Sequence, residues 1–238
     1  MWEGIMKSVI MFLSFVYLFG CISPLAGEGG QKGTNIALIP MYGGLEKTEA
    51  QLELDKKFIS QITEATGSRE KGAQEFVKMG WKTFLAERNP TTAMMRFNQA
   101  WLLDPDNPDV LWGFGAVSGA MGKIADSVKF MRQASEKLGD NAMVLTDLGF
   151  SLTIYANDPE NAETAPAVIA EAISCFEKAE KIKPEYEPLY SNWAVTLFSQ
   201  KDYTGAWDKI GKAEALGGKT VNPMFIKDLE SKMPRPAR

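Results

Sequence analysis

Few residues of this chain have types and spacings that could support catalytic or metal chemistry. The 238-residue sequence contains no histidine, which removes the commonest general base and the commonest metal ligand. Its two cysteines, Cys21 and Cys175, are too few for a cysteine-based zinc site. No nucleophile elbow, phosphate-binding loop or metal-ligand spacing occurs. We therefore expect no catalytic residues, no metal and no cofactor, and predict that the protein is not an enzyme.

Cys21 stands apart because of what precedes it. Lys7 is followed by a largely apolar run at residues 9–19, which would span roughly 17 Å as a helix at ~1.5 Å per residue. A bilayer core is about 30 Å thick, so the run is too short to cross it. Its length is typical of a signal-peptide core. We predict a signal peptide at residues 1–20, starting at Met1 or Met6, and no transmembrane domain elsewhere.

The residues Leu18-Phe19-Gly20-Cys21 resemble the lipobox of bacterial lipoproteins. The resemblance implies cleavage before Cys21, lipidation of Cys21, and a lipid-anchored protein of the cell envelope that faces the periplasm. Several acyl chains, at ~0.8 kcal/mol per buried methylene, make a firm anchor. Ile22 rather than aspartate follows the cysteine, which favours the outer over the inner membrane. A soluble secreted protein cut after Ala26, and a cytosolic protein, are the alternatives.

The elements that would position a binding site follow a sequence repeat. Its copies combine small residues, a large apolar residue and a terminating proline or glycine, and they start 34, 45 and 34 residues apart. The four copies are Ala93, Phe97, Ala100, Pro105; Ser127, Met131, Ala134, Gly139; Ala172, Phe176, Ala179, Pro184; and Ala206, Ile210, Ala213, Gly218. Offsets of four and three place the first three residues of each copy on one helix face. A period of this size indicates a solenoid, whose usual role is binding.

Each unit reads as an antiparallel helix pair. An apolar helix precedes each copy, and Gly115 and Gly149 within two of these helices permit close helix–helix contact. One pair cannot bury its own apolar face, so neighbouring pairs must stack. We predict an all-α superhelix of about four pairs at residues 74–220, with capping helices at residues 46–70 and 221–238. Residues 21–45 are predicted to be a flexible tether, in which the apolar patch 36–39 docks on the solenoid.

The pattern resembles the tetratricopeptide repeat (TPR). Leu148-Gly149 with Leu152, and the quartet that ends at Pro105, fit that family best. Two departures stand out, because Gly80-Trp81 replaces the family's Leu-Gly and about eleven extra residues, 156–166, stretch the third unit. A generic helical bundle with coincidental alanines is the alternative fold.

The TPR resemblance implies a concave face built from the first helix of each pair. By register, this face is an apolar groove with a basic end that would take an amphipathic helix or an extended peptide. The predicted groove residues are Lys78, Lys82, Trp112, Ala116, Thr146, Phe150, Ile154, Ser191, Asn192, Val195 and Phe198. The alternative for each residue is packing against a neighbouring repeat. Gly113 stands where the family's carboxylate clamp has asparagine, so no such clamp is predicted.

The remaining features narrow the classes of partner. The net charge of −4 argues against nucleic acid. The insert 156–166 is polar and acidic, and its carboxylates lack the spacing of a calcium loop. We read it as a solvated loop, with a contact surface as the alternative, and we read Cys175 as a small buried residue.

We therefore predict a non-enzymatic protein–protein interaction scaffold, anchored by lipid in the cell envelope, that assists the assembly of an envelope machine such as a pilus, secretin or peptidoglycan complex. Its partner would be a protein or peptide of the envelope. The alternative is a soluble secreted or periplasmic protein that binds a peptide or small ligand. The identity of the partner and the oligomeric state are left open.

Overall fold

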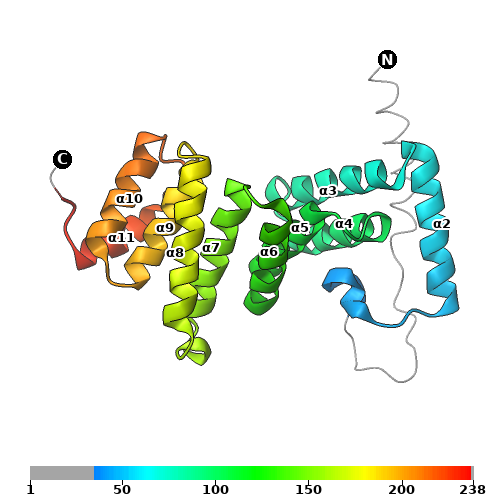
Figure 1. The fold of residues 1–238 in the computed structure, drawn as a ribbon, viewed down its shortest axis with the longest axis horizontal. Helices are drawn as coiled ribbons and strands as arrows, with labels where there is room; N and C mark the ends of the chain where they lie inside the picture. The colour runs from blue at the N-terminus through cyan, green and yellow to red at the C-terminus, as the bar shows by residue number, and fades with distance from the viewer. Residues whose placement is uncertain (1–34, 237–238) are drawn as a thin grey trace, which may run out of the picture.

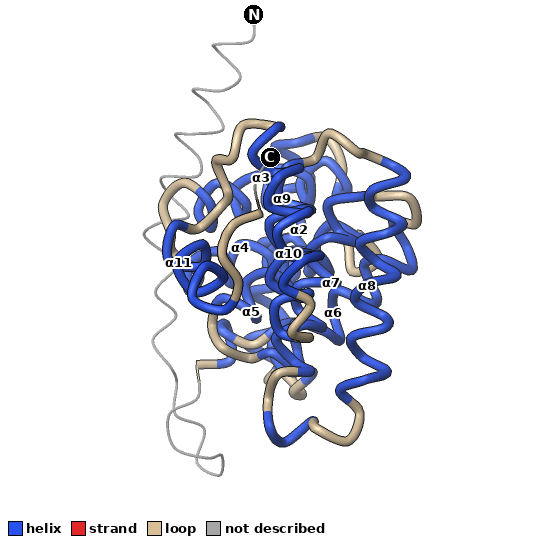
Figure 2. The backbone as a smooth tube through the Cα atoms, turned by 90° about the vertical axis from the view of Figure 1, so that its left-hand side faces the viewer, coloured by secondary structure: helices blue, strands red, loops and turns tan. Residues whose placement is uncertain are grey.

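The computed structural model describes residues 35–236, and every regular element within that range is helical (Figures 1 and 2). Most of the range is built from antiparallel helix pairs that pack tightly within each pair. The pairs are α3 (Arg69–Leu85) with α4 (Pro90–Leu103), α5 (Pro108–Ala120) with α6 (Ile124–Leu138), α7 (Ala142–Ala156) with α8 (Ala165–Ile182), and α9 (Glu187–Ser199) with α10 (Tyr203–Ala215). The prediction of an all-α superhelix of helix pairs is confirmed.

The pairs follow one another along the long axis of the molecule (Figure 1). Successive first helices contact each other, α3 with α5, α5 with α7, and α7 with α9, whereas the second helices pack far less against one another. The first helices therefore line the inner side of the superhelix and the second helices form its outer side.

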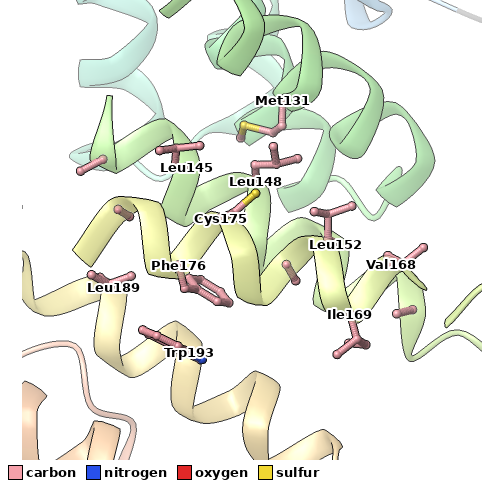
Figure 3. Packing of buried hydrophobic residues seen from close by; sticks show 14 of the residues in the cluster. Met131, Leu145, Leu148, Leu152, Val168, Ile169, Cys175, Phe176, Leu189 and Trp193 are labelled. Carbon is pink, nitrogen blue, oxygen red and sulfur yellow. The ribbon is translucent and has the colours of Figure 1, made fainter. Parts of the chain in front are cut away.

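Glycines on the first helices make room for large side chains from the second helices. A Cβ added to Gly113 would lie 2.2 Å from the ring of Phe97, and one added to Gly80 would lie 2.8 Å from the same ring. Gly149 stands in the same relation to Phe176, at 2.8 Å. Figure 3 shows Phe176 between α8 and Trp193 of α9, and the two rings stack with centroids 5.8 Å apart. Phe97 and Phe176 therefore each contact both their own helix pair and the first helix of the next pair.

The helix starts carry local signals that can be recognised in the sequence. An asparagine N-cap followed by proline opens α4, α5 and the last helix, and the asparagine oxygen accepts a backbone N–H in each case. At Gly67 the backbone has a φ of 86° and ends α2, and Ser68 then caps α3. For this reason α3 begins at Arg69, before the predicted boundary at residue 74.

The N-terminal part of the described chain covers the first pair. Helix α2 (Glu49–Thr66) starts at a Thr48–Gln51 capping box and packs against α3 and α4. The preceding residues form the 3₁₀ turns η1 (Ile36–Leu38) and η2 (Pro40–Gly44), which lie on α4. The buried Asn98 of α4 donates from Nδ2 to the carbonyl oxygens of Ala37 and Ile39, at 2.9 and 3.0 Å.

These contacts correct one prediction and support another. Residues 35–45 are not a flexible tether, because their backbone is held by Asn98 and their 3₁₀ turns pack on α4. The apolar patch 36–39 does dock on the solenoid, as expected. Residues 1–34, which include the predicted signal peptide and Cys21, lie outside the described range.

The other end and the insert complete the architecture. Helix α11 (Pro223–Lys232) packs on α10, and its Phe225 contacts Phe198 of α9 with ring centroids 5.4 Å apart.

Between α7 and α8, the insert forms a short 3₁₀ turn, η3 (Pro159–Asn161), and its acidic side chains are exposed. It lies at the lower extremity of the view in Figure 1. Within residues 35–236, no helix combines the length and the apolar character needed to cross a bilayer.

The glycine contacts predict that Gly113→Ala destabilises the fold. The added Cβ would collide with the ring of Phe97, which is fully buried and cannot swing away. We expect a loss of about 1–3 kcal/mol in the free energy of unfolding, measured by urea denaturation followed by circular dichroism.

Gly211→Ala is the matched control. This residue lies inside α10, and nothing lies within 4 Å of the position that its Cβ would occupy. The higher helix propensity of alanine should stabilise the protein by up to about 1 kcal/mol. Equal effects of the two substitutions would show that ring-on-glycine packing does not hold the pairs together.

Candidate functional site

The inner face begins with a basic and apolar surface on α3. Lys78 and Lys82 lie one turn apart and are both exposed. Nζ of Lys78 donates to Oε1 of Glu75 at 2.8 Å, whereas Lys82 forms no ion pair with any residue between 35 and 236. Leu85, at the end of the same helix, is 67% exposed. This part of the face is open to a partner.

Two tryptophans and an aspartate form the centre of the inner face. The ring of Trp112 on α5 lies against Trp81 of α3, with centroids 4.6 Å apart. Nε1 of Trp112 donates to Oδ2 of Asp147 on α7 at 2.8 Å. The three side chains come from three successive first helices and run across the face in order. We call Trp81, Trp112 and Asp147 the central cluster.

Asp147 is an unusual carboxylate. Part of the residue still reaches solvent, but the surrounding protein removes most of the water from its charge. This desolvation raises its pKa from 3.8 to about 6, against the opposing effect of the hydrogen bond from Trp112. No lysine or arginine within residues 35–236 forms an ion pair with it. The centre of the face therefore carries a poorly hydrated negative charge without a positive partner.

The charge of Asp147 also reaches the next helix pair. Tyr186 immediately precedes α9, and its pKa rises to about 12, first because of burial and second because of the nearby carboxylate of Asp147. Tyr186 is therefore a neutral neighbour that cannot compensate the aspartate.

Next to the central cluster the face is apolar. Phe150 is half-buried and Ile154, one turn further along α7, is 40% exposed. On α5, Ala116 lies one turn after Trp112 and is also half-buried. Thr146 differs from the prediction, because it is fully buried and its hydroxyl donates to the carbonyl oxygen of Ala142 at 2.7 Å. It therefore packs between helices and does not line the groove.

The predicted residues on α9 divide into two groups. Asn192 and Val195 are half-buried on the inner side. Phe198 contacts Tyr203 and Phe225, with ring centroids 5.5 and 5.4 Å away, so it belongs to the packing of the C-terminal cap. Ser191 is buried, and its hydroxyl is 2.6 Å from that of Thr220. The accessible part of the face thus runs from α3 to the middle of α9.

Sequence reasoning missed the two acidic residues of this face. Asp147 follows Thr146 directly, and successive side chains of a helix differ in direction by about 100°. An error of one residue in the predicted register therefore replaces a buried position with an accessible one. Asp109 lies one turn before Trp112, and burial raises its pKa. The available signal was Asp147 itself, the one charged residue within the apolar helix at residues 142–156.

The thiol and carboxylate groups of the described range show little sign of metal or thiol chemistry. No group of three or more cysteine and acidic residues there is arranged to hold a metal ion. Cys175 is buried, and burial raises the pKa of its thiol to about 11, which makes it unreactive at neutral pH. An open depression of about 450 Å³ lies where α6, α7 and α8 meet, and it is lined by Asn141, Met143, Lys183 and Glu185, among others.

The fold is similar to that of TPR proteins of known structure. The thermophilic TPR protein TTC0263 of Thermus thermophilus superposes with a TM-score of 0.60 and 17% sequence identity, over 68% of this chain and 84% of that one. Pseudomonas aeruginosa pilF also aligns at 17% identity, over 72% and 80% of the two chains, but its TM-score of 0.47 is too low to support an inference. No protein-family model and no curated protein matches the sequence. The chain has a TPR-like superhelical fold.

The electrostatics of Asp147 predict that Asp147→Asn stabilises the protein at neutral pH. Asparagine keeps an oxygen to accept the hydrogen bond from Trp112 but removes the desolvated charge. The native aspartate binds a proton below about pH 6 and the unfolded one only below about pH 3.8, so the wild type gains stability as the pH falls through this window. We expect the variant to be more stable by roughly 1–3 kcal/mol at pH 7.5, with the difference vanishing near pH 4.

Urea denaturation at a series of pH values measures this difference, because contributions from other titrating groups cancel between variant and wild type. Asp228→Asn is the control, since Asp228 is exposed on α11 and its replacement should change stability by less than about 0.5 kcal/mol. A less stable Asp147→Asn protein at pH 7.5 would contradict the proposed environment of Asp147.

Proposed function

We propose that this TPR-like superhelix is a scaffold that binds a segment of another protein along its inner face. The observation that carries the proposal is a row of at least partly exposed apolar and aromatic side chains, contributed by successive first helices. Leu85, Trp112, Phe150 and Ile154 belong to this row, and all remain at least partly exposed. Aromatic and aliphatic anchors of this kind supply most of the affinity in protein interfaces.

We further propose that the scaffold is attached by lipid at Cys21 to the cell envelope, faces the periplasm from the outer membrane, and assists the assembly of an envelope machine. This part rests on the sequence of the first 21 residues, where an apolar run is followed by a lipobox-like motif. In the described range, residues 35–45 are held on α4, a second helix, and not on the first helices that form the inner face.

Site-specific crosslinking tests the inner face. A photoreactive amino acid in place of Ile154 should give a crosslinked adduct with a partner protein in cells, because this side chain is 40% exposed on α7. Leu216 is the matched control, since it is 41% exposed but follows α10 on the outer side. The same adduct from both positions, or none from residue 154, would contradict binding along the inner face.

Mass spectrometry of the mature protein tests the anchor. We expect an N-terminal Cys21 that carries acyl chains, and a Cys21→Ser variant that is neither acylated nor retained in the membrane fraction. An unmodified Cys21, or a mature N-terminus after Ala26, would refute the lipid anchor and leave the scaffold proposal standing.

A further inference from the structure

Asp147 has no structural reason to be charged. It lies in the middle of α7 (Ala142–Ala156), so no helix N-terminus compensates its charge. A desolvated carboxylate without a cationic partner lowers stability. By contrast, the half-buried Asp109 lies in the first turn of α5, where the helix dipole favours a negative charge.

Two lysines with little solvent exposure in the described range, Lys209 and Lys47, do have anionic partners. The buried Lys209 has its Nζ 4.0 Å from Glu180 and 3.6 Å from the centre of the Trp193 ring. Lys47 is paired with Asp55. Among residues 35–236, Asp147 receives only the neutral indole N–H of Trp112. A basic residue near α9, Lys183, lies instead over the ring of Tyr186, at 5.7 Å from its centre.

The surroundings of Asp147 match the chemistry of a basic side chain. The indole rings of Trp112 and Trp81 lie beside Asp147 and are only half-buried, and aromatic rings attract cations. A lysine or arginine of a bound segment could place its charged end at the carboxylate and its methylenes against these rings. Beyond the cluster, Phe150 and Ile154 offer apolar surface for the next residues of that segment.

We infer that Asp147 and Trp112 form a subsite for a lysine or arginine side chain of the bound protein segment, with the segment's apolar residues on Phe150 and Ile154. This inference rests on the proposed function, since it names which residue type the inner face selects. Binding would give Asp147 a positively charged partner, which the free protein lacks. Segments with a lysine or arginine at this position would therefore bind more tightly than segments with a neutral residue there.

A random dodecapeptide library displayed on phage tests the subsite. The purified full-length protein and its Asp147→Asn variant are each used for selection at pH 7.5, and the bound pools are sequenced. We expect the wild-type pool to be enriched in lysine or arginine beside apolar residues, and the Asp147→Asn pool to lack the basic residue. Asp228→Asn is the control and should select the same pool as the wild type.

A matched pair of synthetic peptides gives the magnitude. The most enriched wild-type sequence and the same sequence with norleucine in place of its basic residue are titrated against each protein. We expect the replacement to weaken binding to the wild type by at least about tenfold, and to change binding to Asp147→Asn by less than about twofold.

The outcomes separate this inference from the proposed function. A wild-type pool without basic residues, or an Asp147→Asn pool with the same sequences as the wild-type pool, overturns the subsite. If the Phe150→Ala variant then fails to capture the peptides that the wild type selects, the peptide-binding face stands. A failure to enrich any sequence overturns both. A concentration-dependent dimer in light scattering that Asp147→Asn abolishes would make a second copy of this chain the occupant, and would overturn the assignment to a partner protein.

Discussion

The structure depends on one packing constraint, the fit of a large side chain on a second helix into the space left by a glycine on a first helix. Phe97 fills the space at Gly80 and Gly113, and Phe176 fills that at Gly149. The contact is close because glycine has no Cβ, and interiors packed at crystal-like density tolerate no extra methyl group there. Since Phe97 touches its own pair and the next, one contact sets both the geometry within a pair and the stacking between pairs.

This constraint also determines what the inner face displays. In α3, α5 and α7 the glycine side packs against these rings, and the side chains that turn away from it stay at least partly exposed. Trp81, Trp112, Phe150 and Ile154 therefore reach the inner face without a role in the ring-on-glycine contact, apart from the edge contact of Trp81 with Phe97. In the first pair, Gly80 is followed directly by Trp81. The tryptophan then turns towards Trp112 and links the first two pairs.

The central cluster shows how a scaffold can trade stability for selectivity. An asparagine at position 147 would keep an oxygen to accept the hydrogen bond from Trp112 and would avoid the cost of desolvating a charge. Groups with a strongly shifted pKa and no structural partner are more often found at functional sites than elsewhere. The N-terminal residues 35–45 are held elsewhere, because Asn98 binds their backbone on the outer helix α4.

The sequence by itself determined the all-helical fold and the pairing of the helices, and it contains local signals for several helix ends. These follow from local periodicity, from Asn-Pro and Ser caps, and from a repeat whose small and large residues must meet on one face. It also indicated the insert between α7 and α8 and the burial of Cys175. What only the tertiary structure decided is which side of each first helix faces the groove. Successive side chains of a helix differ in direction by about 100°, so an error of one residue changes which side chain faces the groove. For this reason the groove contains Asp147 where Thr146 was predicted, and Phe198 packs in the C-terminal cap. The sequence indicated that the apolar patch 36–39 docks on the solenoid, but the 3₁₀ turns that hold residues 35–45 on α4 were not predictable, because they depend on Asn98, a residue far along the chain from the two carbonyl groups that it holds.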